Sequence, residues 1–460
     1  FAIELGINIP TGKDSLSMKQ KYPNDEVIAP GTVIISAGGN CTDIRKVVEP
    51  VLQKDGGSIY YINLSQDEFK LGGSSFAQTL NAIGNEAPTI KEAKFFKKAF
   101  NTIQELILEN QILAGHDIGS GGLITTLLEM CFADVNLGAK IDFSVFEEKD
   151  IIKYLFAENI GIVFQAKDNA TIEAKLNANG VSFYKLGNAT TEATLDFGPC
   201  KLDIVKYRDI WFKTSFLLDQ KQSKNGMAQE RFDNYKNQPL QYAFPTHFTG
   251  KSPEIDSSKP RPKAAIIREK GSNSEREMAN AMYLAGFDVK DIHMTDLISG
   301  RENLEDIQFI GAVGGFSNSD VLGSAKGWAG AFLYNEKAKT ALDNFFKRED
   351  TLSVGICNGC QLFVELELIH SEHEKMPKMS YNDSNKHESI FTSVTVQENK
   401  SVMLSSLAGA TLGVWVSHGE GKFELPLGEE RYNIVGKYAY EGYPANPNGS
   451  HYDVAMLCDV

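Results

Sequence analysis

One cysteine lies in a segment that favours nucleophilic chemistry. Cys357 is the centre of Gly-Ile-Cys-Asn-Gly at 355–359, which follows an apolar strand-like run and precedes an apolar helix-like run through Leu366. Glycines on both sides of a nucleophile allow a tight turn from a strand into a helix. At the helix N-terminus, the dipole and free N–H groups favour a thiolate and lower the cysteine pKa. The segment predicts a reactive Cys357, with the N–H of Asn358 placed to stabilise an oxyanion.

The same cysteine belongs to a second pattern, in which it binds a metal. Cys357 and Cys360 are followed by His370 and His373, and these four residue types can bind zinc. The stretch 361–369 between the two pairs is largely apolar and has the character of a core helix. A small zinc loop would leave its Leu, Phe and Val side chains in water. A nucleophile is the favoured interpretation, zinc is an alternative, and a buried structural cysteine is a third.

Strands and helices alternate around Cys357, and they must position it. Apolar strand-like segments lie at 264–268, 287–292, 307–313 and 351–354, and residues 275–285 have a helical pattern. Strands that alternate with helices indicate a parallel α/β sheet.

The first half of the chain has a different pattern. Strand-like runs lie at 33–36, 58–64 and 161–165, and apolar residues recur at helical spacing over 92–113. This half is predicted to be α+β or mixed α/β. Between the halves, residues 214–262 are rich in proline and polar residues, which predicts an irregular linker.

Composition limits the classes of function. Of the 460 residues, 60 are Asp or Glu and 46 are Lys or Arg, so the formal net charge is −14. Binding of nucleic acid needs clustered basic residues and is not expected. No apolar run approaches the roughly 18 residues that span a membrane. Six cysteines are too few for a disulfide scaffold, and no signal peptide is evident, so we expect a cytoplasmic protein.

The segment around Cys357 resembles the nucleophile motif of class I glutamine amidotransferases. Four further motifs narrow the resemblance to the phosphoribosylformylglycinamidine synthase family in its long single-chain form. These motifs are 268–274 (Arg-Glu-Lys-Gly-Ser-Asn-Ser), 314–320 (Gly-Gly-Phe-Ser-Asn-Ser-Asp), 417–421 (Ser-His-Gly-Glu-Gly) and 443–449 (Tyr-Pro-Ala-Asn-Pro-Asn-Gly). The resemblance implies a flavodoxin-like α/β amidotransferase domain in the second half.

In this family Cys357 would attack the carboxamide of glutamine, release ammonia and leave a thioester for water to hydrolyse. By analogy, the N–H groups of Asn358 and Gly315 would form the oxyanion hole, and Gly359 and Gln361 would belong to the same glutamine site. The remaining motif residues are expected to shape the glutamine pocket or a domain contact: His418, Glu420, Asn446 and Asn448.

His418 and Glu420 resemble the other two members of a Cys-His-Glu triad, and we interpret them as a decoy. In the family the catalytic His and Glu lie in a later His-Pro-Glu-like motif. The chain ends at Val460, soon after Asn-Pro-Asn-Gly at 446–449. We therefore expect the catalytic His and Glu to be missing. A Cys hydrolase of the same α/β fold is a further alternative, which would leave the motifs of the first half unexplained.

The first half resembles the ATP-using synthetase part of the same family, related to aminoimidazole ribonucleotide synthetase, an α+β fold. Its motifs are 9–18, 71–75, 115–123 and 155–161. ATP would phosphorylate the amide oxygen of formylglycinamide ribonucleotide, and ammonia would displace the phosphate to give the amidine. The residues expected to face substrate or nucleotide are Lys13, Asp14, Ser15, Gly72 and Gly73.

Asp117 is the expected ligand of Mg²⁺, which would shield the phosphates. It precedes a helix-like stretch at 123–132, whose N-terminus favours anions. The family pattern continues with Ser and a second Asp, where this chain has Gly119 and Ser120. This departure leaves open a structural ADP in place of a reacting ATP, or a simple helix cap.

The resemblance assigns four segments to the chain. They are the end of a synthetase N-type subdomain (1–57), a synthetase C-type subdomain (58–213), a linker (214–262) and the amidotransferase domain (263–460). We expect the chain to be the C-terminal portion of such an enzyme. Its expected partners are small molecules: glutamine, ATP and formylglycinamide ribonucleotide.

Overall fold

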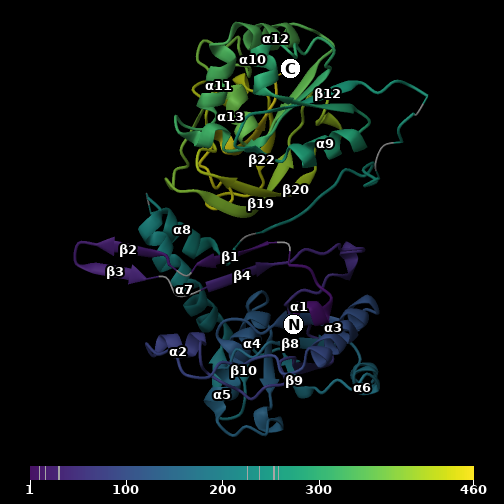
Figure 1. The fold of residues 1–460 in the computed structure, drawn as a ribbon, viewed down its shortest axis with the longest axis vertical. Coiled ribbons are helices and arrows are strands. Elements are labelled where there is room, and N and C mark those ends of the chain that lie inside the picture. The colour runs from purple at the N-terminus through teal and green to yellow at the C-terminus, as the bar shows by residue number, and fades with distance from the viewer. Residues whose placement is uncertain are drawn as a thin grey trace. The chain divides into compact units, whose positions relative to one another are not determined.

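The chain folds into two compact units, Phe1–Phe212 and Lys213–Val460, which are labelled by element in Figure 1. The structure is a computed structural model. It describes every residue except Pro10, Leu16, 29–31, Asn225, Gln238, Ser252, Pro253, Ser257 and Val460, together with the side chains of a few strand residues beside these. No helix among the described residues combines the length and the apolar character that a membrane crossing requires.

A seven-stranded sheet forms the centre of the first unit, in the order β11-β10-β7-β9-β5-β8-β6. Neighbouring strands are antiparallel except β7 and β10, which are parallel. The bounds are β5 Ser58–Asn63, β6 Ile112–Asp117, β7 Gly138–Ile141, β8 Gly161–Ala166, β9 Tyr184–Thr190, β10 Thr194–Asp196 and β11 Lys201–Asp203.

Helices cover both faces of this sheet. Successive side chains of a strand point to opposite faces, and in β5 Ile59 and Tyr61 pack in one apolar cluster while Tyr60 and Ile62 pack in another. The first cluster includes α4 and α5, and the second includes α3 and α6. The helices are α2 Ser75–Thr79, α3 Ala93–Leu108, α4 Gly122–Phe132, α5 Ile151–Phe156 and α6 Asn169–Ala178. A strand buried on both faces explains why residues 58–64 are almost continuously apolar.

The chain before β5 contains short elements. Strands β1 and β4 pair antiparallel, and so do β2 and β3. The elements are α1 Ala2–Leu5, β1 Thr11–Ser15, β2 Lys19–Tyr22, β3 Asp25–Ile28 and β4 Thr32–Ser36.

A parallel four-stranded sheet is the first layer of the second unit, in the order β14-β12-β15-β17. In chain order this is 2-1-3-4, the order of flavodoxin-like folds, whose ligands bind beyond the carboxyl ends of the strands. The bounds are β12 Lys263–Arg268, β14 Asp288–His293, β15 Phe309–Ala312, β17 Leu352–Gly355, α9 Glu275–Leu284, α10 Met294–Ser299, α11 Lys326–Leu333, α12 Glu336–Phe346 and α13 Asn358–Glu365.

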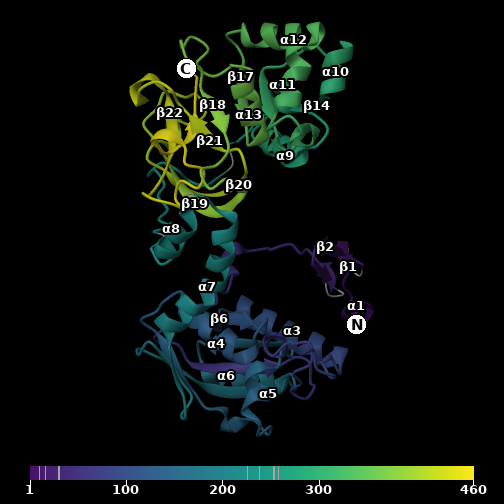
Figure 2. The same cartoon turned by 90° about the vertical axis from the view of Figure 1, so that its left-hand side faces the viewer.

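An antiparallel sheet follows in the same unit, in the order β20-β19-β22-β23. Figure 2 shows this yellow-green sheet beside the green helices α10 to α13. Two small pairs, β13–β16 and β18–β21, complete the unit. The bounds are β13 Ser272–Asn273, β16 Gly314–Gly315, β18 Lys378–Ser380, β19 Glu388–Val396, β20 Thr411–His418, β21 Lys422–Glu424, β22 Ile434–Tyr438 and β23 Val454–Leu457. The predicted fold classes of both halves are confirmed.

Two local predictions are wrong. The helix predicted over 92–113 ends at Leu108, and Leu113 belongs to β6, because a chain reversal at Asn110 (φ 53°) separates the two elements. The segment 214–262 is not irregular at its start, since α7 Ile204–Gln222 and α8 Met227–Asn234 occupy it. Tertiary contacts hold these helices, including that between the rings of Phe216 and Phe232, which are tilted by 31° with centroids 4.6 Å apart.

Candidate active site

The turn between β17 and α13 presents Cys357 at the helix N-terminus. Cys357 has φ 55° and ψ −112°, a strained conformation for a residue with a side chain. Glycines make the turn possible on both sides. A Cβ on Gly355 would lie 2.5 Å from the Gly359 carbonyl oxygen, and one on Gly359 would lie 2.1 Å from the Ala312 carbonyl oxygen. Close approaches between backbone segments therefore explain why glycine occupies both positions.

We expect Gly359→Ala to destabilise the second unit. The added methyl group meets a backbone oxygen of β15, which cannot rotate away, so the cost is about 1–3 kcal/mol of unfolding free energy. Thermal unfolding of the purified protein measures it. Gly419→Ala is the matched control, because a Cβ there meets nothing within 4 Å. Equal melting temperatures for the two variants would contradict the close approach.

The thiol of Cys357 lies in a half-closed environment. Burial raises its pKa above the ordinary value, while hydrogen bonds from the backbone N–H groups of Gly315 and Asn358 lower it, and the nearby Asp320 raises it. Burial is the largest effect, so the prediction of a lowered pKa is wrong: the helix terminus does not offset desolvation. The two N–H groups at the sulfur are those predicted for the oxyanion hole. Their position supports that role, which stays a prediction.

His418 lies beside the nucleophile, which the decoy interpretation did not anticipate. Its Nδ1 atom is 4.0 Å from Cys357 Sγ. Its Nε2 atom is 3.1 Å from the amide nitrogen of Asn448, which also donates to Tyr438. Burial and the neighbouring His387 lower the pKa of His418 to about 4. At pH 7 the ring is therefore neutral, and one of its two nitrogens carries a proton.

Glu420 does not orient His418. Its carboxylate accepts a hydrogen bond from the Ser324 N–H at 3.3 Å, and its carbonyl oxygen accepts one from the Gln361 side chain at 2.7 Å. Gln361 in turn accepts from the Asn358 amide at 3.0 Å, and the Asn358 side-chain oxygen accepts from the Ser317 N–H at 3.2 Å. The side chains of Asn358 and Gln361 are buried. Their hydrogen bonds join α13 to the loops that contain Ser317 and Glu420.

Asn446 organises the turn before β23. Its side-chain oxygen accepts from the N–H groups of Gly449 and Ser450 at 3.0 Å each, and its amide donates to the Ser450 carbonyl at 2.9 Å. Of the two asparagines predicted for the glutamine pocket, the structure therefore brings only Asn448 to the side of His418.

The pKa values predict how Cys357 reacts with a small alkylating reagent. Because the thiol pKa is raised, the thiolate fraction is small at pH 7, and the rate with iodoacetamide should rise about tenfold per pH unit through pH 9. If His418 is a decoy and not the proton acceptor, His418→Gln should change that rate less than about threefold. Mass spectrometry of the labelled peptide measures the rate, with exposed Cys41 as internal control for the reagent. A plateau already at pH 7 would contradict the raised pKa.

The zinc site of two cysteines and two histidines is not formed. Among the described residues, a group of possible metal ligands is formed by His370, Glu372 and His373, and it includes neither cysteine. The Cys360 sulfur is 4.0 Å from the Met379 sulfur in an apolar cluster, and burial raises its pKa to about 12. A thiolate ligand is therefore strongly disfavoured at that position.

Three predicted motifs of the first unit meet at one carboxylate. Glu158 Oε1 accepts hydrogen bonds from the Ser75 N–H at 2.7 Å and from the Gly121 N–H at 2.8 Å. It thus joins the loop of Gly72 and Gly73 to the glycine-rich loop before α4. A Cβ on Gly72 would lie 2.2 Å from the Glu86 carbonyl oxygen, and Gly73 has φ 75°. These two glycines shape the loop, and only their backbone can contact a ligand.

Asp117 ends β6 just before the second of these loops. Its side chain is 83% exposed, and its carboxylate is 3.2 Å from His116 Nδ1. The pKa of His116 is raised above its ordinary value, chiefly because the imidazole is hydrogen-bonded to Glu129. An exposed carboxylate is a suitable ligand for a hydrated cation. Lys13, Asp14 and Ser15 lie in β1, but their side chains lie outside the described residues.

A buried charge cluster escaped prediction from the sequence. Arg231 of α8 donates to Glu388 at 2.5 Å, Tyr443 donates to the same carboxylate at 2.7 Å, and Glu388 is fully buried. Arg231 also contacts Asp219, which pairs with Lys386. Arg231 and Glu388 are 157 residues apart and Asp219 and Lys386 are 167 residues apart, so no local spacing could indicate these pairs.

Comparison with known families assigns both units. Residues 54–197 match the C-terminal domain of AIR synthase related proteins, and residues 261–460 match the CobB/CobQ-like glutamine amidotransferase domain. The fold and the Cys357 turn thus define a glutamine amidotransferase domain that follows an AIR-synthase-like domain.

Two curated relatives match nearly the whole chain. The chain is 37% identical to a probable phosphoribosylformylglycinamidine synthase, chloroplastic/mitochondrial, of Arabidopsis thaliana, over 99% of the chain and 34% of that protein. It is 35% identical to the phosphoribosylformylglycinamidine synthase of Homo sapiens, over 99% of the chain and 37% of that protein. The chain is thus similar to phosphoribosylformylglycinamidine synthases, and it spans about a third of the length of these relatives.

Among solved structures, PurLQS from Thermotoga maritima is similar over 43% of the chain and 82% of that protein, with 23% identity and a TM-score of 0.34.

Proposed function

We propose that this chain supplies the glutaminase nucleophile and part of the synthetase machinery of an enzyme that converts formylglycinamide ribonucleotide to the amidine. The reaction would consume ATP and glutamine, in purine biosynthesis. The relatives' names and the two matched domains support the proposal. The single observation that carries it is the turn at Cys357, where two backbone N–H groups face the sulfur of a residue at a helix N-terminus.

The glutaminase half-reaction follows from this turn. The Cys357 sulfur attacks the carboxamide carbon of glutamine, and the N–H groups of Gly315 and Asn358 stabilise the oxyanion that forms. The C–N bond then breaks, ammonia leaves with the thiol proton, and water hydrolyses the thioester to glutamate. His418 is neutral at pH 7 and positions the sulfur through their contact at 4.0 Å; the base that removes the thiol proton is another group.

The synthetase half-reaction is proposed for the two glycine-rich loops of the first unit. The loops of Gly72 and Gly73 and of residues 119–122 meet at Glu158, and free N–H groups at loop and helix starts suit phosphate. Asp117 would hold Mg²⁺ that accompanies the nucleotide, since such ions need only one or two protein carboxylates. ADP held structurally is the other occupant of this site. We also propose that the protein resides in the cytoplasm.

The test is product stoichiometry in a preparation that spans the full length of the relatives. We expect one glutamate and one ADP per amidine, and no amidine when ATP or Mg²⁺ is omitted. Amide hydrolysis that proceeds equally well without ATP and without formylglycinamide ribonucleotide would support a simple Cys hydrolase and contradict the proposal.

A further inference from the structure

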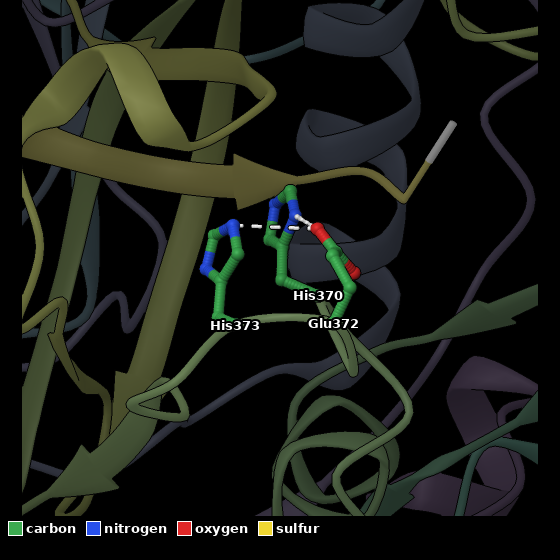
Figure 3. Close-up of side chains that lie close together, drawn as sticks. All are labelled: His370, Glu372 and His373. Atoms are coloured by element: carbon green, nitrogen blue, oxygen red, sulfur yellow. Dashed lines mark hydrogen bonds and ion pairs between the residues drawn. The ribbon is translucent and has the colours of Figure 1, made fainter.

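Two buried histidines and an exposed glutamate lie together in the turn after α13 (Figure 3). His370 is 2% exposed and His373 is 6% exposed, whereas the Glu372 side chain is 64% exposed. Their possible ligand atoms all lie within 4.8 Å of one another. The two imidazoles are therefore held inside the unit, while the carboxylate gives access from solvent.

The spacing of these atoms is that of ligands around an ion. Glu372 Oε1 is 3.4 Å from His370 Nδ1 and 3.3 Å from His373 Nε2. A direct charge-assisted hydrogen bond would be shorter, about 2.7–2.9 Å. Ligands of a tetrahedral ion, with metal–nitrogen and metal–oxygen bonds of about 2.0–2.2 Å, lie about 3.3–3.5 Å apart. Both observed distances match the second arrangement.

Packing fixes the two rings before any ion arrives. The rings stack with centroids 4.7 Å apart and planes 8° apart, and Tyr432 packs edge-on against both. The His373 N–H donates to the His370 carbonyl at 3.0 Å and closes the turn. Rings that are already oriented lose little entropy when they bind an ion.

The cluster also leaves one buried atom unsatisfied. His373 Nδ1 has no hydrogen-bond partner among the described residues, so the contact to Glu372 is the one polar interaction that its ring is seen to make. A buried imidazole with so few polar partners is costly, and a metal–nitrogen bond at Nε2 would offset part of that cost. Asp459 Oδ1 lies 3.9 Å from His370 Nδ1 and offers a second carboxylate.

We propose that His370, Glu372 and His373 bind a divalent transition-metal ion of the zinc type. Two neutral imidazoles and a carboxylate form a nitrogen–oxygen set that suits Zn²⁺ and Co²⁺. The ion holds the turn after α13 beside the ends of β22 and β23, where Tyr432 and Asp459 lie. The site is structural, and it is distinct from Cys357.

Metal binding requires a change of tautomer at His370. The Asn433 N–H donates to His370 Nε2 at 3.4 Å, which places the ring proton of the neutral imidazole on Nδ1. Metal binding at Nδ1 moves that proton to Nε2, so this long contact has to open by a small turn of the ring.

Co²⁺ titration of chelator-treated protein tests the site. We expect one equivalent of Co²⁺ with the visible absorption of tetrahedral coordination, displaced by Zn²⁺, and a higher melting temperature with either ion. Glu372→Gln and His373→Ala should each weaken the affinity at least about tenfold. Because Glu372 is exposed, its variant folds even if the buried histidine variant does not, and circular dichroism checks both.

Two matched controls separate this site from others. His247→Ala removes an exposed histidine that contacts the Ser406 carbonyl, and Cys360→Ala removes the nearest cysteine of the four-residue pattern. Both should bind Co²⁺ as the parent protein does. Loss of binding in Cys360→Ala, a thiolate-to-cobalt charge-transfer band, or no stoichiometric binding at micromolar protein would each overturn the proposal.

Discussion

Cys357→Ala abolishes glutamine-dependent amidine formation and leaves ammonia-dependent formation intact in the full-length enzyme. The reason is that glutamine is cleaved at the β17–α13 turn, whereas free ammonia needs only the synthetase part. Removal of the sulfur eliminates the covalent step entirely, so we expect a loss of at least about a thousandfold in glutamine-dependent kcat/KM. Parallel assays with glutamine and with ammonium chloride measure both rates on one preparation.

Cys360→Ala is the control for this experiment, because it lies one turn along the same helix and faces the apolar cluster around Met379. It should keep glutamine-dependent turnover within about threefold. If Cys357→Ala loses turnover with both glutamine and ammonia, glutamine cleavage and amidine formation share one site. Full retention of glutamine-dependent turnover would remove Cys357 from the mechanism.

Arg231→Met should destabilise the second unit by about 3–5 kcal/mol. The substitution keeps the volume of the side chain and leaves the fully buried Glu388 carboxylate without its cation, which is the costly way to break a buried ion pair. For a unit of about 250 residues, this corresponds to a fall in melting temperature of about 6–20 °C. Differential scanning calorimetry measures the change.

Two further variants make that measurement decisive. Arg231→Met combined with Glu388→Gln should recover much of the loss, because no charge remains buried. Lys339→Met removes an ion pair with Asp343, in which the side chains are 51% and 45% exposed, and should cost less than about 1 kcal/mol. If the single variants at Arg231 and Lys339 cost the same, the buried cluster does not stabilise the unit.

The elements that a local pattern could indicate were predicted, and those that depend on distant contacts were not. The alternation of strands and helices after residue 263 and the two glycines around Cys357 have local causes, and both are found. Helices α7 and α8 are polar in sequence and depend on partners such as Glu388 and Tyr443, far along the chain. Because contacts between residues so far apart in the sequence leave no local pattern, the two helices were not predicted.

The same distinction applies to the site. Glycine spacing locates the nucleophile, but the cysteine pKa depends on burial, which no spacing reveals. The sequence separation of His418 from Cys357 is 61 residues, and tertiary packing brings the imidazole at the end of β20 to the thiol. His370, Glu372 and His373 are close in sequence, and there a His-x-Glu-His pattern could have suggested three ligands without the cysteines.

The shared acceptor at Glu158 makes the two glycine-rich loops of the first unit mechanically dependent. Each loop is anchored to the same oxygen atom, so displacement of either one removes a hydrogen bond of about 1 kcal/mol and shifts the carboxylate that anchors the other. Ligands that contact the two loops could therefore not bind as independent events. Their occupancies would carry a coupling free energy, and Glu158 would transmit it in both directions.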